Sequence, residues 1–314
     1  MKSVHLIAVQ SELRLEHYRE REAFEARVLE LCARAVEGLP EGEPRIIAFP
    51  EAFALPLVFW LETPEQVVRS GSALEAGLRL LRLRWREALG TATLSPSALF
   101  HLRALEVWPL WERAFARAAR QSAAYVIAGS LFSPLVDWEP ARGYHRKSRR
   151  VYNLSLVFNP QGTLLARVPK INLTMDERRS FLQGGSWGDQ VIHTRLGRIA
   201  NLICLDAFHE HLIERCDAAG AWLVVQPSAN AARWEGPWSA DPARLEGQVW
   251  LREGLARKLE GRENLRYGIN PMLNGRLYNF RFEGRSGVYA PGQVLALADL
   301  PTGDAIVRSR VEPP

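Results

Sequence analysis

The chain has 314 residues, of which 47% are hydrophobic and 24% are charged, and its formal net charge is +5. This composition excludes a disordered or collagen-like protein, and a chain of this length buries enough surface to fold without disulfides or a structural metal. The densest basic stretch, residues 142–150, is interpreted as a solvated loop, because it lacks the interleaved aromatic residues of a single-strand binder and any DNA-binding motif. We therefore expect no nucleic-acid partner.

The cysteines and the lack of targeting segments indicate the cellular compartment. Cys32, Cys204 and Cys216 form no CxxC pair, so neither a disulfide framework nor a cysteine-based zinc site is expected. His209 and His211 lie two residues apart on a predicted helix and face different ways, which disfavours a metal site there. No apolar run reaches the ~18 residues of a membrane span, and the N-terminus lacks the pattern of a secretory signal. We expect a cytoplasmic protein with no metal and no membrane partner.

Strand-like and helix-like patterns alternate along most of the chain. Residues 4–9 form a short apolar run, and Phe24, Val28, Leu31 and Ala35 follow it at helical spacing. Further strands are predicted at residues 46–49, 125–128, 152–158, 163–168, 199–203 and 222–226, with a helix over residues 208–219. Residues 159–162, Asn-Pro-Gln-Gly, favour a hairpin turn between two of these strands. The pattern predicts an α/β fold with mixed sheets.

Residues 64–120 depart from this alternation, because they are predicted to be helical. Leu74, Leu78, Leu81 and Trp85 share one stripe, and Ser95-Pro96 resembles an N-cap followed by the first residue of a helix. These helices lie between two predicted strands and are interpreted as an addition to the sheet. They either pack on the fold or cover a pocket, and the sequence leaves both possibilities open.

Three chemically capable side chains each follow a predicted strand. A strand-to-helix turn at Cys204 would expose its thiol, and the N–H groups of the helix would favour a thiolate. Glu51 directly follows residues 46–50, a position where the sheet holds a general base rigidly beside a cleft. Lys170 also follows a strand, and Glu177 seven residues later adds a second carboxylate. Taken singly, each residue also fits a structural role, as a core cysteine or a surface charge. Their shared position at strand ends favours a joint site.

In this arrangement the chain resembles the nitrilase, or carbon–nitrogen hydrolase, superfamily. The likeness extends over nearly the whole chain, and no single motif carries it. The matching segments are Ile46-Ile47-Ala48-Phe49-Pro50-Glu51, Tyr152-Asn153, residues 159–162, residues 167–173, Glu177 with Phe181 and Gly184, Gly197-Arg198, Cys204-Leu205-Asp206, Gly220-Ala221, residues 226–230, Arg262-Glu263-Asn264, residues 284–287 and residues 290–295.

The resemblance implies a four-layer α-β-β-α sandwich, formed by a single carbon–nitrogen hydrolase domain over residues 1–314 with an extra helical insertion around residues 64–120. Family members usually assemble as homodimers or larger homo-oligomers. The implied reaction hydrolyses a non-peptide carbon–nitrogen bond of a small-molecule amide or N-carbamoyl compound. It proceeds through a covalent thioester, releases ammonia or an amine, and needs no cofactor.

The same resemblance assigns a role to each candidate residue. Cys204 is the nucleophile, and Glu51 is the general base and acid. Lys170 stabilises the oxyanion, helped by the backbone N–H of Leu205. Glu177 is an auxiliary glutamate that positions the lysine and the substrate.

Two departures from the family pattern leave the substrate open. Leu205 stands where the family often has an aromatic residue, and the stretch between Glu51 and residue 125 is longer than the family minimum. Cys204-Leu205-Asp206 is nearer the amidase and carbamoylase branches than the nitrilases, which favours an amide or N-carbamoyl substrate. Nitrile hydrolysis by the same residues is an alternative. A non-catalytic binding or scaffold protein on the same fold is another. Trp187, Trp234 and Trp238 line an aromatic pocket or fill core and loop packing.

Overall fold

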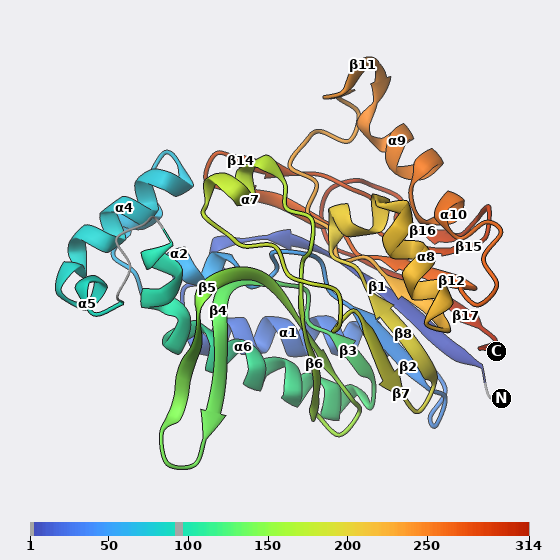
Figure 1. Ribbon diagram of the computed structural model, residues 1–314, viewed down its shortest axis with the longest axis horizontal. Coiled ribbons are helices and arrows are strands. Elements are labelled where there is room, and N and C mark those ends of the chain that lie inside the picture. Colours follow the sequence, from blue (N-terminus) through green and yellow to red (C-terminus); the bar gives the residue numbers. More distant parts are fainter. Residues whose placement is uncertain (1–2, 92–96, 314) are drawn as a thin grey trace.

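The computed structural model describes residues 3–91 and 97–313. Two large β-sheets face each other at its centre, and helices cover the outer face of each sheet (Figure 1). The two chain ends lie at the same end of the molecule (Figure 1). There β17 (Ala305–Val311) pairs antiparallel with β1 (Val4–Leu13).

The larger sheet has nine strands and a parallel centre. In it β1, β2 (Arg45–Ala48) and β3 (Tyr125–Ile127) run parallel, and β5 (Gly143–Phe158) pairs antiparallel with β3. A tight turn joins β5 to β6, because Gly162 has a φ of +72° and Asn159 Oδ1 accepts a hydrogen bond from the Gln161 backbone nitrogen at 3.0 Å. The hairpin expected at residues 159–162 is therefore confirmed. The other strands of this sheet are β4 (Leu131–Glu139), β6 (Leu164–Pro169), β13 (Leu273–Leu277), β14 (Phe280–Phe282) and β17.

The smaller sheet has six strands and also has a parallel centre. β8 (Gly197–Asn201), β9 (Ala221–Val225) and β12 (Tyr267–Asn270) run parallel, which confirms the two strands expected near residues 199–203 and 222–226. The outer strands are β7 (Val191–Thr194), β15 (Gly287–Ala290) and β16 (Gln293–Leu297). A separate two-stranded hairpin consists of β10 (Pro237–Trp238) and β11 (Asp241–Leu245).

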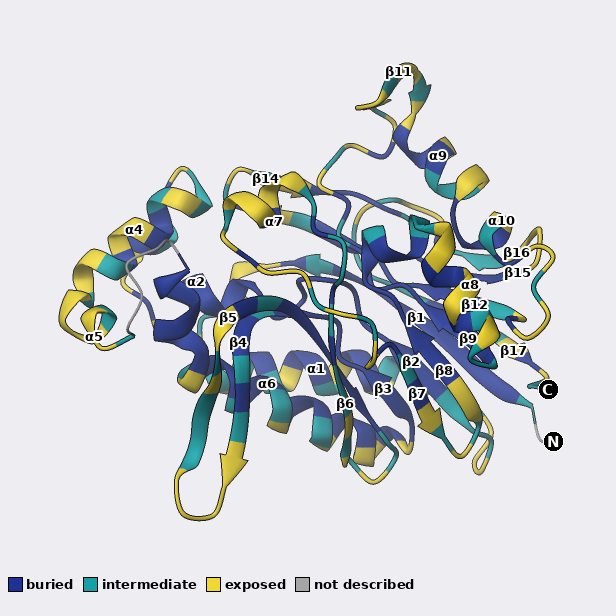
Figure 2. Ribbon diagram, in the orientation of Figure 1, coloured by how far each residue is buried: buried dark blue, intermediate teal, exposed yellow. Residues whose placement is uncertain are grey.

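Three apolar clusters account for a four-layer arrangement. Alternate residues of the parallel strands point to opposite faces, so that Ile47 packs against the outer helices and Ile46 packs between the sheets. Between the sheets, Ile46 lies in one cluster with Leu223 and Ile269. Outside the smaller sheet, Ile213 belongs to a third cluster. The molecule is thus an α-β-β-α sandwich, as expected, with buried central strands (Figure 2).

Helices α1 (Arg21–Val36), α6 (Ala98–Ser122) and α8 (Glu210–Ala218) cover the sheets, and α6 does so although most of it lies in the predicted insertion at residues 64–120. The helix predicted from Phe24, Val28, Leu31 and Ala35 is α1, and all four side chains are buried. It covers the larger sheet together with α6, and α8 covers the smaller one. The other helices are η1 (Leu15–His17), α2 (Pro56–Trp60), α3 (Glu65–Val68), α4 (Ala73–Leu83), α5 (Trp85–Leu89), α7 (Met175–Arg179), η2 (Cys204–Phe208), α9 (Glu246–Glu253) and α10 (Leu255–Lys258).

The described part of the insertion is helical as predicted, but of its predicted stripe only Leu81 packs against the core. α4 packs inward through Ala76 and Leu80, which are buried. Leu74, Leu78 and Trp85 point outward and are 67%, 56% and 54% exposed. The proposed start of a helix at Ser95-Pro96 lies outside the described residues.

The basic stretch at residues 142–150 is not a loop. Residues 143–150 form the first half of β5, paired antiparallel with β4 in a long hairpin. Most side chains of this stretch are polar, so it lacks the alternation of apolar and polar residues that marks a strand in a sequence. A partly buried strand in a projecting hairpin needs few apolar residues. Within the part of the chain that the structure describes, every helix is too short or too polar to span a bilayer.

Candidate active site

The four candidate side chains meet in one buried site. Glu51 follows β2, Lys170 follows β6, and Cys204 is the first residue of η2 after β8. Glu177 lies on α7, which begins with a capping box in which Thr174 Oγ1 accepts a hydrogen bond from the Glu177 backbone nitrogen. The exposed fractions are only 5% for Glu51, 1% for Lys170, 8% for Cys204 and 5% for Glu177. Charged groups are this deeply buried only when they are paired.

A buried ammonium joins the two carboxylates. Lys170 Nζ lies 2.7 Å from Glu51 Oε1 and 2.9 Å from Glu177 Oε2. Asn153, which is fully buried on β5, donates hydrogen bonds from Nδ2 to Glu51 Oε1 at 2.8 Å and to Glu177 Oε1 at 2.6 Å. The backbone nitrogen of Ala229 donates to Glu51 Oε2 at 3.0 Å. Both oxygens of Glu51 are therefore held in place by donors.

The backbone at Cys204 is held in an uncommon conformation. Its φ is +49°, in the left-handed region that non-glycine residues rarely adopt. Two hydrogen bonds hold it there: the Cys204 nitrogen donates to the Pro227 oxygen, and Gln226 Nε2 donates to the Cys204 oxygen, each at 2.9 Å. The expectation of an exposed thiol is wrong, because the segments that carry the two glutamates and Lys170 enclose the turn and leave Cys204 only 8% exposed.

Burial and charge set the protonation of the site. Burial raises the pKa of Glu51, the Glu177 carboxylate raises it further, and the Lys170 ammonium opposes both. Burial likewise raises the pKa of the Cys204 thiol, and the Glu51 carboxylate adds to that shift. For Lys170, burial disfavours the charge, but the acidic groups around it outweigh burial and raise its pKa. These shifts oppose the thiolate that the helix N–H groups were expected to favour. The site gathers the Cys204 thiol, the Glu51 carboxyl group and the Lys170 amine, and each shifts the pKa of the others.

A thiol, a base and a cation in one enclosed site are the components of thiol-dependent acyl transfer. The family model described as carbon–nitrogen hydrolase matches residues 8–251. The chain belongs to the carbon–nitrogen hydrolase family. A search of curated proteins found no match.

Solved structures of the nitrilase superfamily share the fold of this hydrolase family member. Nit3 of Saccharomyces cerevisiae, a member of branch 10 of that superfamily, has a TM-score of 0.61 at 17% identity, covering 99% of this chain and 91% of its own. A carbon–nitrogen hydrolase from Helicobacter pylori G27 has a TM-score of 0.66 at 15% identity, covering 98% and 89%. A mutant of an amidase from Nesterenkonia sp. AN1, with the acetamide moiety of fluoroacetamide added covalently at its active-site cysteine, has a TM-score of 0.65 at 17% identity, covering 99% and 90%.

Sequence reasoning missed two buried polar residues that support the site of this hydrolase. The first is Asn153, which bridges the two glutamates. The second is Asp206, which is 1% exposed and accepts hydrogen bonds from the backbone nitrogens of Ile171 and Asn172 at 2.9 and 2.7 Å. Asn153 interrupts an apolar strand, and Asp206 lies two residues after the cysteine. Both positions were visible in the sequence, but their partners lie in distant segments.

The three tryptophans considered for an aromatic pocket take part in packing. Trp234 is 7% exposed and lies so close to Gly247 that a Cβ added there would come within 2.4 Å of its ring. Trp187 packs under the guanidinium of Arg215, which lies 4.4 Å from the ring centroid. Trp238 is covered in the same way by Arg244, at 5.1 Å. These contacts favour the packing interpretation over an aromatic pocket.

Proposed function

We propose that the chain hydrolyses a non-peptide carbon–nitrogen bond of an amide or N-carbamoyl compound through a thioester on Cys204. The observation that carries this proposal is the contact of Glu51 with Lys170 at 2.7 Å in the buried site that also holds Cys204. A carboxylate that donors hold in place can serve as the base for the thiol proton. The amide adduct on the cysteine of the Nesterenkonia amidase mutant supports amides as the first substrates to test.

In the first half-reaction, Cys204 Sγ attacks the carbonyl carbon while its proton passes to Glu51. The carbonyl π electrons move to oxygen, and the oxyanion is stabilised by the Lys170 ammonium and the backbone N–H of Leu205. When the tetrahedral intermediate collapses, the carbon–nitrogen bond breaks. The departing nitrogen takes the proton from Glu51 and leaves as ammonia or an amine, with the acyl group bound to Cys204.

In the second half-reaction, Glu51 accepts a proton from a water molecule while the water oxygen attacks the thioester carbon. The carbon–sulfur bond then breaks, the proton returns to the sulfur, and the acid is released. Glu177 and Asn153 contact no reacting atom in this scheme. They position the groups that do: Asn153 donates to Glu51 and to Glu177, and Glu177 accepts from Lys170.

The test is release of ammonia or amine from a panel of aliphatic and aromatic amides, N-carbamoyl amino acids, ureido acids and nitriles. We expect turnover of an amide or carbamoyl compound that is lost in Cys204→Ala and kept in Cys216→Ala, since Cys216 is a buried cysteine of the α8 core. Preference for a nitrile would overturn the substrate class. Equal turnover by wild type and Cys204→Ala would overturn the mechanism. No turnover, with a Cys204 thiol inert to alkylation, would favour the non-catalytic alternative.

The remaining expectations stay predictions: one domain over residues 1–314, a homodimer or larger homo-oligomer, a cytoplasmic location and no cofactor. Pairing of β17 with β1 supports the first, because it joins the two ends of the chain in one sheet. The other three are testable by light scattering, fractionation and assay of the purified protein without additives.

A further inference from the structure

The outer face of α4 and α5 carries an apolar stripe that the proposed reaction does not use. It consists of Leu74, Leu78 and Arg82 on α4, followed by Trp85 and Leu89 on α5, which begins after a break at Arg84, and is called the outer stripe here. Leu89 is 63% exposed, so all four of its apolar side chains are more than half exposed. Exposed apolar groups gathered on one protruding element, rather than scattered singly, indicate an interaction surface.

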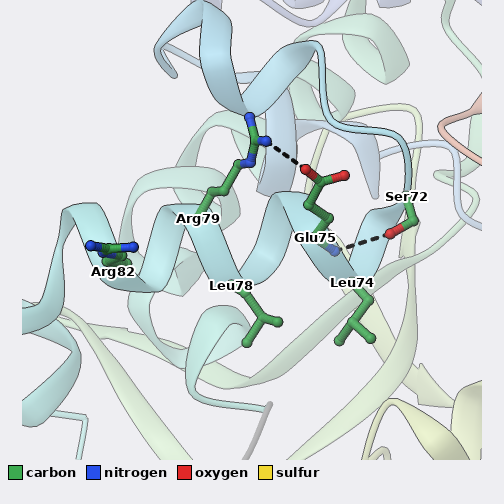
Figure 3. A pocket seen from close by; sticks show the side chains of 6 residues that line it. All are labelled: Ser72, Leu74, Glu75, Leu78, Arg79 and Arg82. Carbon is green, nitrogen blue, oxygen red and sulfur yellow. Dashed lines mark hydrogen bonds and ion pairs between the residues drawn. The ribbon is translucent and has the colours of Figure 1, made fainter.

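The opposite face of α4 is already occupied. Gly77 is buried at the contact with Leu99 of α6, where an added Cβ would come within 3.1 Å of the leucine side chain. Figure 3 shows Leu74 and Leu78 projecting together from one side of α4, away from the ion pair of Glu75 with Arg79. The outer stripe is therefore not the face that holds the helix to the fold.

Cations accompany the apolar side chains. Arg82 makes no ion pair with any residue in 3–91 or 97–313, although it lies in the middle of the outer stripe. Arg86 likewise has no carboxylate partner in these ranges, and its guanidinium lies 5.3 Å from the centroid of the Trp85 ring. Uncompensated guanidiniums beside exposed leucines and a tryptophan favour a partner that is both apolar and anionic.

We propose that the outer stripe docks on an anionic lipid bilayer surface. Leu74, Leu78 and Leu89 would enter the boundary between headgroups and acyl chains, and Trp85 would lie at headgroup depth. Arg82 and Arg86 would then pair with lipid phosphates. A second copy of the chain fits less well, because two antiparallel stripes centred on each other would place Arg82 against Arg82.

The position of the helices suits contact with a flat surface. α4 and α5 lie at one end of the long axis of the molecule, opposite the two chain ends (Figure 1). They can therefore reach a bilayer without burying the rest of the protein. The expectation of no membrane partner rested on the lack of a spanning segment, which does not bear on contact with a membrane surface. The proposal is independent of the reaction proposed for Cys204.

Sedimentation with vesicles tests the proposal. The purified chain is mixed with vesicles of phosphatidylcholine alone and with vesicles that also contain phosphatidylglycerol. We expect binding to the anionic vesicles, weakened by salt and reduced at least about tenfold in Leu78→Glu and in Arg82→Glu. Leu300→Glu is the matched control, because Leu300 is 65% exposed elsewhere on the surface, and it should bind like wild type.

Circular dichroism checks that each variant is folded, and Trp85→Ala replaces any variant that is not. Absence of binding to anionic vesicles, or equal binding by wild type and all stripe variants, would overturn the proposal. A dimer seen by light scattering that dissociates in Leu78→Glu, without vesicle binding, would also overturn it and would assign the outer stripe to a second copy.

Discussion

The carboxylate of Asp206 accepts a hydrogen bond from the backbone nitrogen of Ile171 at 2.9 Å. Asp206 lies two residues after Cys204, and Ile171 is the residue after Lys170. Asp206 also accepts a hydrogen bond from the backbone nitrogen of Asn172 at 2.7 Å. Together the two bonds fix the turn that carries the thiol relative to the turn that carries the ammonium. Their spacing is thereby set by short, local links between two loops, and not by the sheets alone.

We predict that Asp206→Ala lowers kcat more than its effect on folding explains. Loss of the shared acceptor leaves partly buried N–H groups unpaired, which should lower the free energy of unfolding by about 1–3 kcal/mol. Asp217→Ala is the matched control, because Asp217 accepts from the backbone nitrogens of Glu263, Asn264 and Leu265 far from the site. Denaturant unfolding and kcat are measured for both. Similar unfolding losses with equal kcat values would contradict a positioning role for Asp206.

Lys170→Met should remove the oxyanion cation and leave two buried carboxylates without their counter-charge. We expect kcat to fall by about a hundred- to a thousandfold and the free energy of unfolding to fall by about 3–5 kcal/mol. Lys258→Met is the control, since Lys258 pairs with Glu210 at 2.8 Å near the surface and should cost less than about 1 kcal/mol. Retention of wild-type kcat in Lys170→Met would exclude Lys170 from the reaction.

The raised pKa of Glu51 predicts where activity fails in acid. A protonated Glu51 cannot accept the thiol proton, so kcat/KM falls as the pH drops through the pKa of Glu51. Since burial raises that pKa, the midpoint should lie above the ordinary carboxyl value of ~4.3. Glu177→Gln removes a negative charge that raises the same pKa, so the midpoint should move to lower pH. An unmoved or higher midpoint in Glu177→Gln would contradict this coupling.

Asn153→Leu should shift the same midpoint in the opposite direction. The Nδ2 group donates to Glu51 at 2.8 Å and to Glu177 at 2.6 Å, and donors to a carboxylate favour its charged form. Without them the midpoint should move to higher pH, and kcat should fall about tenfold or more. Asn201→Leu is the control, because Asn201 is equally buried but donates to Ser155 Oγ at 2.9 Å. It should lower stability without moving the midpoint.

The sequence predicted the residues at strand ends because their signal is local. An apolar run followed by a chemically active residue is readable at Glu51, Lys170 and Cys204, and the sheets then bring those strand ends together. Asn153 and Asp206 could not be assigned roles in this way. Their partners lie on separate segments, and only the pairing of β5 with β6 and the approach of η2 to the Lys170 turn make the contacts.

The orientation of the apolar stripe at residues 74–85 and the pKa of Cys204 could not be predicted from the sequence, for the same physical reason. Periodicity identifies an amphipathic helix but not the partner of its apolar face, so it could not tell that Leu78 is exposed while Leu81 packs against the core. Burial and carboxylates from elsewhere in the chain raise the pKa of Cys204, against the effect expected of the short helix that follows it. The partner of a helix face and the pKa of a buried thiol both depend on how distant segments pack in the folded chain.

The central claim is a thioester on Cys204, and the most direct measurement is its mass. The enzyme is quenched in acid during turnover of the preferred amide, digested, and analysed by mass spectrometry. We predict that the peptide containing Cys204 gains the mass of the acyl group, that is, the substrate less ammonia or amine, and that the peptides containing Cys32 and Cys216 stay unmodified. Substrate turnover by Cys204→Ala at the wild-type rate, with no acylated peptide in the wild-type digest, would contradict the mechanism.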